Sequence, residues 1–105
     1  MKSLFAIYDS YIDCNECKIV ELDNMTAGIF LENNCINGKI MSTANIGLLH
    51  NDELVSLMSF RKCRFDESHE WEITRVCNKL NVDVIGAEKM LLSYFENKYK
   101  PTSIL

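Results

Sequence analysis

The stretch at residues 81–95, "NVDVIGAEKMLLSYF", decides the fold of this chain. A strand-like run ends just upstream of it, Gly86 follows Ile85, and an amphipathic helix begins immediately afterwards. A strand, a glycine turn and a helix N-terminus together form an arrangement that proteins use to hold phosphate groups. The stretch therefore predicts either a cofactor-binding loop or only the outline of one.

The composition predicts one globular domain over residues 1–105. Hydrophobic residues make up 48% of the chain and charged residues 25%, which are ordinary values for a soluble domain. The first ten residues contain too short an apolar stretch for a signal peptide, and no run approaches the roughly 18 apolar residues of a membrane span. We therefore expect a cytoplasmic protein without a membrane partner.

The charge balance excludes a general nucleic-acid binder. The formal net charge is −4, from fifteen acidic against eleven basic residues. Affinity for nucleic acids depends on basic groups that neutralise phosphates. The one basic cluster, "RKCR" at residues 61–64, is followed at once by acidic residues. No direct binding of nucleic acid is expected.

The cysteines form neither a disulfide framework nor a zinc site. Cys14 and Cys17 make a CxxC pair, but zinc needs four ligands, and Cys35, Cys63, Cys77 and His69 are scattered. A redox CxxC usually opens a helix after a strand, whereas a strand-like run follows this one. We expect idle thiols in a reducing compartment and no metal site.

The first half of the chain predicts strands around residues 4–8 and 17–22, then a helix capped by Asp23 or Asn24. The predicted apolar stripe of this helix contains Met25, Ile29 and Phe30. Residues 45–60 predict a tight hairpin, because two apolar strands flank two residues that tolerate positive φ, Asn51 and Asp52.

The second half predicts a strand at residues 71–77, a connection at 78–83 and a helix at 85–98. The apolar face of this helix contains Met90, Leu91, Tyr94 and Phe95. Pro101 ends it, and residues 102–105 begin one more strand, parallel to the strand before it. The expected fold is α+β, with a mixed, largely antiparallel sheet, a parallel strand pair near the C-terminus and two flanking helices.

Three segments resemble the GNAT acyltransferase fold, in particular a GNAT-like domain of phage and mobile-element proteins. They are "IGLLHNDELVSLMSF" at 46–60, "WEITRVCNKLNVDVIGAEKMLLSYF" at 71–95 and "NKYKPTSIL" at 97–105. The resemblance covers roughly residues 14–105 and implies a half-fold truncated after the fifth strand. It also implies acetyl-CoA as the cofactor of an active member.

In the family, the loop that binds the diphosphate normally has Arg or Gln, then Gly three positions later, then Gly or Ala two positions after that. With Gly86 at the first small position, Asp83 replaces the Arg or Gln and Glu88 replaces the second small residue. A carboxylate about 5 Å from a phosphate repels it by about 1–3 kcal/mol at an effective dielectric of 20–80. Glu88 also has an ordinary role, since an acid in the first turn stabilises a helix.

The alternative register, with Ala87 at the second small position, leaves Ile85 at the first glycine and Val82 at the basic position. The candidate cofactor-binding residues are thus Asp83, Ile85, Gly86, Ala87 and Glu88. We predict that they form a degenerate acetyl-CoA loop that stays empty.

No residue is predicted to be catalytic. Glu72 and Glu70 are the candidates for a general base, because a buried carboxylate on a strand can activate an amine. The simpler interpretation is that both glutamates face solvent and alternate along the strand with the buried Trp71 and Ile73. In the family, the tyrosine that protonates the leaving thiolate belongs to the second half of the fold, which would continue from the position of Leu105.

The acidic loop predicts a binding surface made of Asp66, Glu67, Glu70 and Trp71, with the tryptophan as an anchor. Together with the resemblance, it suggests a non-catalytic inhibitor of a host nucleic-acid-handling or defence protein, of the anti-CRISPR type. The alternatives are an acetyl-CoA-dependent N-acetyltransferase of a protein or small amine, and an accessory module of a mobile-element endonuclease system. We also expect either a homodimer that pairs the strand edges at residues 102–105 or a partner protein that covers them, together with the helix face that has lost some of its cover.

Overall fold

The computed structural model describes residues 10–62, 70–101 and 104. The strands are β1 (Ser10–Asp13), β2 (Lys18–Leu22), β3 (Ala44–His50), β4 (Glu53–Lys62), β5 (Trp71–Asn78) and β6 (Val82–Ile85). The helices are η1 (Cys14–Glu16, a short 3-10 helix), α1 (Asn24–Asn34) and α2 (Ala87–Tyr99). Strands β2, β3, β4 and β5 form an antiparallel sheet, and β1 pairs in parallel with β6.

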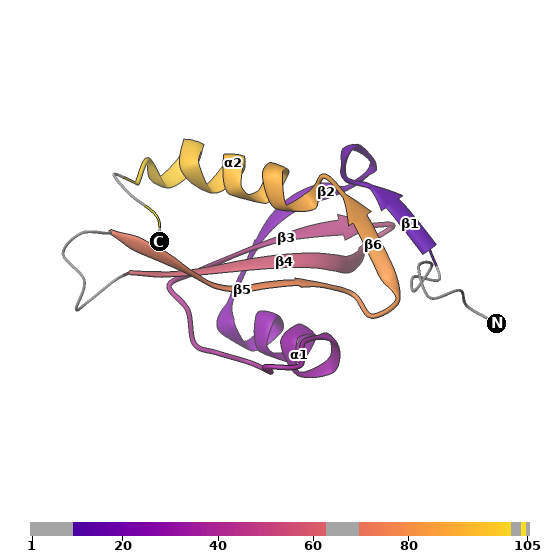
Figure 1. The fold of residues 1–105 in the computed structure, drawn as a ribbon, viewed down its shortest axis with the longest axis horizontal. Helices are drawn as coiled ribbons and strands as arrows, with labels where there is room; N and C mark the ends of the chain where they lie inside the picture. The colour runs from indigo at the N-terminus through magenta and orange to yellow at the C-terminus, as the bar shows by residue number, and fades with distance from the viewer. Residues whose placement is uncertain (1–9, 63–69, 102–103, 105) are drawn as a thin grey trace.

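The four-stranded sheet lies between α2 on one side and α1 on the other (Figure 1). Met58 and Phe60 of β4 pack in the cluster that contains Leu91 and Phe95 of α2. Leu57, directly before Met58 in sequence, packs on the α1 side, because successive side chains of a strand point to opposite faces. The predicted α+β class, with a mixed sheet flanked by two helices, is confirmed.

An aromatic cluster fixes α2 on the sheet. The rings of Phe60 and Phe95 are stacked with centroids 3.7 Å apart, and Trp71 meets Phe95 edge-on at 4.9 Å. Tyr99 stacks on Phe95 at 4.8 Å and donates a hydrogen bond to Glu21 of β2 at 2.8 Å. Of the predicted apolar face of this helix, Leu91 and Phe95 are fully buried, whereas Met90 and Tyr94 are only partly buried.

A buried polar network attaches α1 to the other face of the sheet. The amide of Asn24 exchanges two hydrogen bonds with the backbone of Ser42, each 3.1 Å long. Asn45 of β3 donates to Asn24 at 3.1 Å and accepts from Ser59 of β4 at 2.7 Å. The Ser42 hydroxyl lies 2.9 Å from that of Thr74 on β5. The network therefore ties the start of α1 to three neighbouring strands.

The predicted N-cap of α1 is confirmed, but its predicted stripe is wrong in two of three positions. Asp23 accepts a hydrogen bond from the backbone N–H of Thr26 at 2.7 Å, which holds the pKa of its carboxyl below the usual value. Met25 and Ile29 point to solvent, with 78% and 61% of their surface exposed. The polar network sets the rotation of the helix, so that Leu31 faces the sheet together with Ala27 and Phe30.

The predicted connection at residues 78–83 is also too long, because Asn78 belongs to β5 and its last two residues begin strand β6. Val82 and Val84 are buried in the core, and Asn81 makes the preceding turn with a φ of 63°. Strand β6 is stabilised by β1, a partner that was not predicted from the sequence. Helix α2 consequently begins at Ala87, two residues later than expected.

The hairpin prediction is confirmed, since Asn51 and Asp52 join β3 to β4 with φ values of 52° and 65°. The strand predicted at residues 4–8 lies outside the described residues. So do residues 102, 103 and 105 of the predicted terminal strand. Ile104 makes a parallel bridge to Trp71, in the predicted direction.

Candidate functional site

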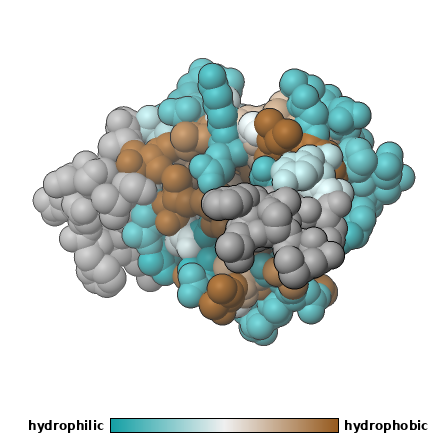
Figure 2. All heavy atoms as spheres, turned by 45° about the vertical axis from the view of Figure 1, so that its right-hand side comes forward, coloured by the Kyte–Doolittle hydropathy of each residue, from teal (hydrophilic) through white to brown (hydrophobic). Residues whose placement is uncertain are grey.

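A cleft of about 790 Å³ lies between β5, β6 and the start of α2. It exists because β6 turns away from β5 on its way to the helix (Figure 1). The apolar part of its lining includes Met58, Ile73, Val76 and Leu92. Figure 2, which turns the right-hand side of Figure 1 forward, shows hydrophobic side chains gathered left of centre among hydrophilic ones.

All of the residues predicted for the cofactor loop line this cleft: Asp83, Ile85, Gly86, Ala87 and Glu88. The residues of the strand, glycine and helix pattern thus lie together at one cleft. The structure adds Lys89, which also faces it. Two carboxylates and one ammonium give the described lining a net charge of −1.

This charge works against the phosphates that the helix N-terminus attracts. The N-terminal end of a helix carries about half a positive charge, and Glu88 lies in that first turn. Asp83 stands on β6, three residues before Gly86. The full negative charge of each carboxylate exceeds the partial positive charge of the helix N-terminus. The cleft therefore favours a cationic or neutral group over a diphosphate.

Cys14 covers the glycine at the centre of the site. Gly86 has a φ of +79°, which a residue with a side chain rarely adopts. A Cβ atom built on it would lie 2.9 Å from the Sγ of Cys14. Strand β1 is responsible, because its pairing with β6 places η1 against the start of α2.

Strand β2 begins at Lys18, directly after the CxxC pair, as expected from the sequence, and β1 ends at Asp13, just before the pair. Burial raises the pKa of the Cys17 thiol, and the neighbouring Cys14 and Glu16 raise it further. The Cys17 thiol donates to the carbonyl of Asp13 at 3.7 Å. A raised pKa disfavours the thiolate, which is the nucleophilic form, so the Cys17 thiol is not activated as a nucleophile.

A second pair of thiols lies in the core beneath α1. Cys77 of β5 is buried, and Cys35 at the end of α1 packs against the same cluster. Burial raises the pKa of Cys77 to about 12, and the nearby Cys35 contributes to the rise. The Cys77 thiol therefore stays protonated at physiological pH.

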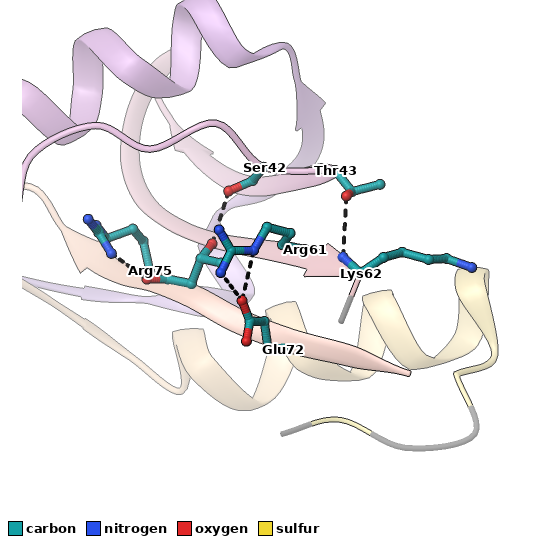
Figure 3. Close-up of polar contacts among 7 residues, drawn as sticks. Ser42, Thr43, Arg61, Lys62, Glu72 and Arg75 are labelled. Atoms are coloured by element: carbon teal, nitrogen blue, oxygen red, sulfur yellow. Dashed lines mark hydrogen bonds and ion pairs between the residues drawn. The ribbon is translucent and has the colours of Figure 1, made fainter. Parts of the chain in front are cut away.

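The two candidate general bases lie away from the cleft. Glu72 accepts a hydrogen bond from Arg61 Nε at 2.8 Å and forms an ion pair with the same guanidinium (Figure 3). Glu70 stands directly before β5. The described lining of the cleft contains neither acid, so the structure does not bring them together with the predicted loop.

The predicted anchor of the acidic loop belongs to the core. Trp71 is 4% exposed and packs against Phe95 and Tyr99, with the ammonium of Lys62 5.3 Å from its ring centre. Its ring is therefore not an exposed anchor for a partner. Asp66 and Glu67 lie outside the described residues.

Lys89 and Cys14 are the residues of the site that the sequence did not predict. Lys89 directly follows the loop, and this position was the available signal. Cys14 carries no such signal, because only the pairing of β1 with β6 brings it to Gly86.

No known family, curated protein or solved structure matches this chain. The resemblance to the GNAT fold therefore stays a prediction. Neither α1 nor α2 is long and apolar enough to cross a membrane. Among the residues that the structure describes, no group of three His, Cys, Asp or Glu side chains is arranged to hold a metal ion.

We predict that Gly86→Ala lowers the free energy of unfolding more in the wild type than in a Cys14→Ala background. The positive φ costs a residue with a Cβ about 1–2 kcal/mol in both backgrounds, whereas the clash with Sγ exists only in the wild type. Urea denaturation measures both differences. Gly28→Ala is the control, because its Cβ would make only ordinary contacts at 3.6 Å. Equal losses in the two backgrounds would show that Cys14 does not cover Gly86.

We predict that Cys77 makes the protein less stable as the pH rises above about 8.5. The Cys77 thiol of the unfolded chain ionises above this pH, whereas the thiol of the folded protein has a pKa of about 12 and keeps its proton. Ionisation therefore stabilises the unfolded state relative to the folded state. One such group lowers the free energy of unfolding by up to about 1.4 kcal/mol per pH unit. Urea denaturation of reduced protein at pH 8, 9 and 10 should give a shallower decline for Cys77→Ala. Parallel declines would contradict the assignment.

Proposed function

We propose that this domain is a non-catalytic protein-binding module whose partner presents a basic surface. The observation that carries the proposal is the charge of the cleft at the start of α2, where Asp83 and Glu88 outnumber Lys89. Such a cleft attracts arginine and lysine side chains and repels phosphates. The net charge of −4 adds a long-range attraction to basic proteins.

The contact between Cys14 and Gly86 supports the same proposal. Phosphate-binding loops use glycine so that the ligand can approach the backbone closely. Here a cysteine side chain takes up part of the space next to Gly86. A diphosphate at this position would have to displace it and also accept two carboxylates nearby.

Within this class, we propose an inhibitor of a host protein that handles nucleic acid or takes part in defence, of the anti-CRISPR type. Proteins that bind nucleic acids carry basic surfaces that contact phosphates. A small acidic domain that occupies such a surface competes with the nucleic acid. The acids of the cleft then act in place of phosphates, and the apolar lining holds the aliphatic part of a long basic side chain.

The test is a capture experiment with host lysate in which the charges of the cleft are reversed. Asp83→Lys with Glu88→Lys should abolish capture of a basic protein that the wild type retains at low salt. The matched control is Glu53→Lys with Glu96→Lys, which makes the same change of net charge away from the cleft. Since the Glu53 ion pair with Lys79 is on the surface, its loss costs at most about 1 kcal/mol. Mass spectrometry identifies the retained proteins.

Capture that survives reversal at the cleft would reject the cleft as the contact. In that case the triple reversal of Asp66, Glu67 and Glu70 to lysine tests the acidic loop. If the control variant loses capture to the same degree, only overall charge matters, and the proposal of a specific surface fails.

An acetyl-CoA-dependent N-acetyltransferase is the second candidate, because the cleft contains the whole predicted cofactor loop. A thermal scan with millimolar acetyl-CoA separates the candidates. A ligand at 100 times its Kd adds about 2.7 kcal/mol, which raises the Tm of a domain of this size by roughly 10–20 °C. The binding-module proposal predicts an unchanged Tm. A clear rise that Gly86→Asp abolishes would favour the enzyme.

A further inference from the structure

Helix α1 carries apolar side chains on two opposite sides. Leu31 and Phe30 are buried against the sheet, whereas Met25 and Ile29 point away from it. Glu32 is the only charged residue within the helix. A helix that is apolar on both sides is expected to be covered on both.

The outer side of α1 borders a hollow of about 790 Å³, separate from the cleft at α2. We call it the α1 groove; its main lining residues are Met25, Gly28, Ile29, Glu32, Lys39 and Met41. Met41 is 73% exposed, which is similar to Met25. Figure 2 shows hydrophobic side chains at the lower edge of the molecule, at the height of α1 in Figure 1. Contiguous exposed apolar surface of this kind marks an interaction site.

A protruding side chain lies in the turn that follows α1. Ile36 is as exposed as in an extended chain, and it belongs to the turn that leads from α1 to Lys39. The turn has a defined position, because Arg75 of β5 donates hydrogen bonds to the carbonyls of Asn37 and Gly38, at 3.3 and 3.1 Å. An exposed apolar side chain thus has a defined place in the chain segment that joins α1 to Lys39.

The charges of the α1 groove are balanced. Its lining contains one acid, Glu32, and one base, Lys39. In a two-fold symmetric dimer each surface meets a copy of itself, so residue i contacts residue j and j contacts i. A surface with net charge repels its own copy, whereas one acid and one base on a neutral surface can pair across the axis. The cleft at α2, with its net charge of −1, does not meet this condition.

We infer that the α1 groove binds the α1 groove of a second copy of this chain in a two-fold symmetric dimer. Ile36 of each copy enters the hollow of the other, and Glu32 of each faces Lys39 of the other. Because α1 and α2 lie on opposite sides of the sheet, both α2 clefts remain open (Figure 1). The dimer is thus independent of the proposed function, to which it would add a second binding site.

Sedimentation velocity of the reduced full chain, from micromolar to several hundred micromolar, tests the dimer. The expected species has twice the 12.1 kDa mass of the chain. Ile29→Lys places two ammonium groups near the axis and should raise the Kd at least about 100-fold. Its far-UV circular dichroism should match the wild type, because Ile29 is already exposed. Leu80→Lys is the control, since Leu80 is equally exposed but lies in the turn after β5.

A charge exchange tests the register of the contact. Glu32→Lys and Lys39→Glu should each weaken self-association, because each creates like charges across the axis. An equimolar mixture of the two variants should form a heterodimer, in which both pairs are again opposite in charge. Mass spectrometry under native conditions distinguishes the three species.

A wild type that stays monomeric throughout this range would overturn the inference. A dimer that Ile29→Lys leaves intact would show that the copies associate through another surface, such as the strand edge near Ile104. A mixture of the charge variants without heterodimer would contradict the proposed pairing of Glu32 with Lys39.

Discussion

The stacking of Phe95 on Phe60 is the contact on which the rest of the structure depends. Strand β4 is central in the sheet, so both of its faces must be covered, and Phe60 supplies the surface on which α2 rests. Trp71 and Tyr99 enclose Phe95 from two further directions. Aromatic pairs of this kind contribute about 0.5–1.5 kcal/mol beyond the burial of their area. They determine where the C-terminal half of the helix lies.

The N-terminal half of α2 is fixed by different means, and the cleft results from the difference. Strand β6 leaves the plane of β5 and pairs with β1, which brings Cys14 onto Gly86. The start of the helix is thus attached to the small sheet while its end is attached to the large one. Apolar side chains of β5, such as Ile73 and Val76, line this cleft.

The two sides of the sheet have different electrostatic character, and this suits different partners. On the α2 side, acids outnumber bases around an apolar hollow, which favours a basic partner of another kind. On the α1 side, the exposed apolar surface has balanced charge, which favours a second copy of the chain. A dimer joined through α1 would hold two α2 clefts at a fixed separation. Two linked sites bind a repeated or dimeric target more tightly than either does alone.

Local sequence determined the features that depend on neighbouring residues alone: the turn at Asn51 and Asp52, the cap at Asp23, the end of α2 before Pro101, and the acids beside Gly86. Turn, cap and strand alternation are governed by the φ preferences and hydrogen bonds of nearby residues, so they can be recognised from the sequence. Only the tertiary structure decided which side of α1 is buried, that residues 82–85 form a strand, and that Cys14 covers Gly86. Each of these depends on a partner distant in the chain: the polar network of Asn45 and Ser59 for α1, and β1 for the other two. Apolar periodicity could not distinguish the inner from the outer side of α1, because both sides of that helix are apolar.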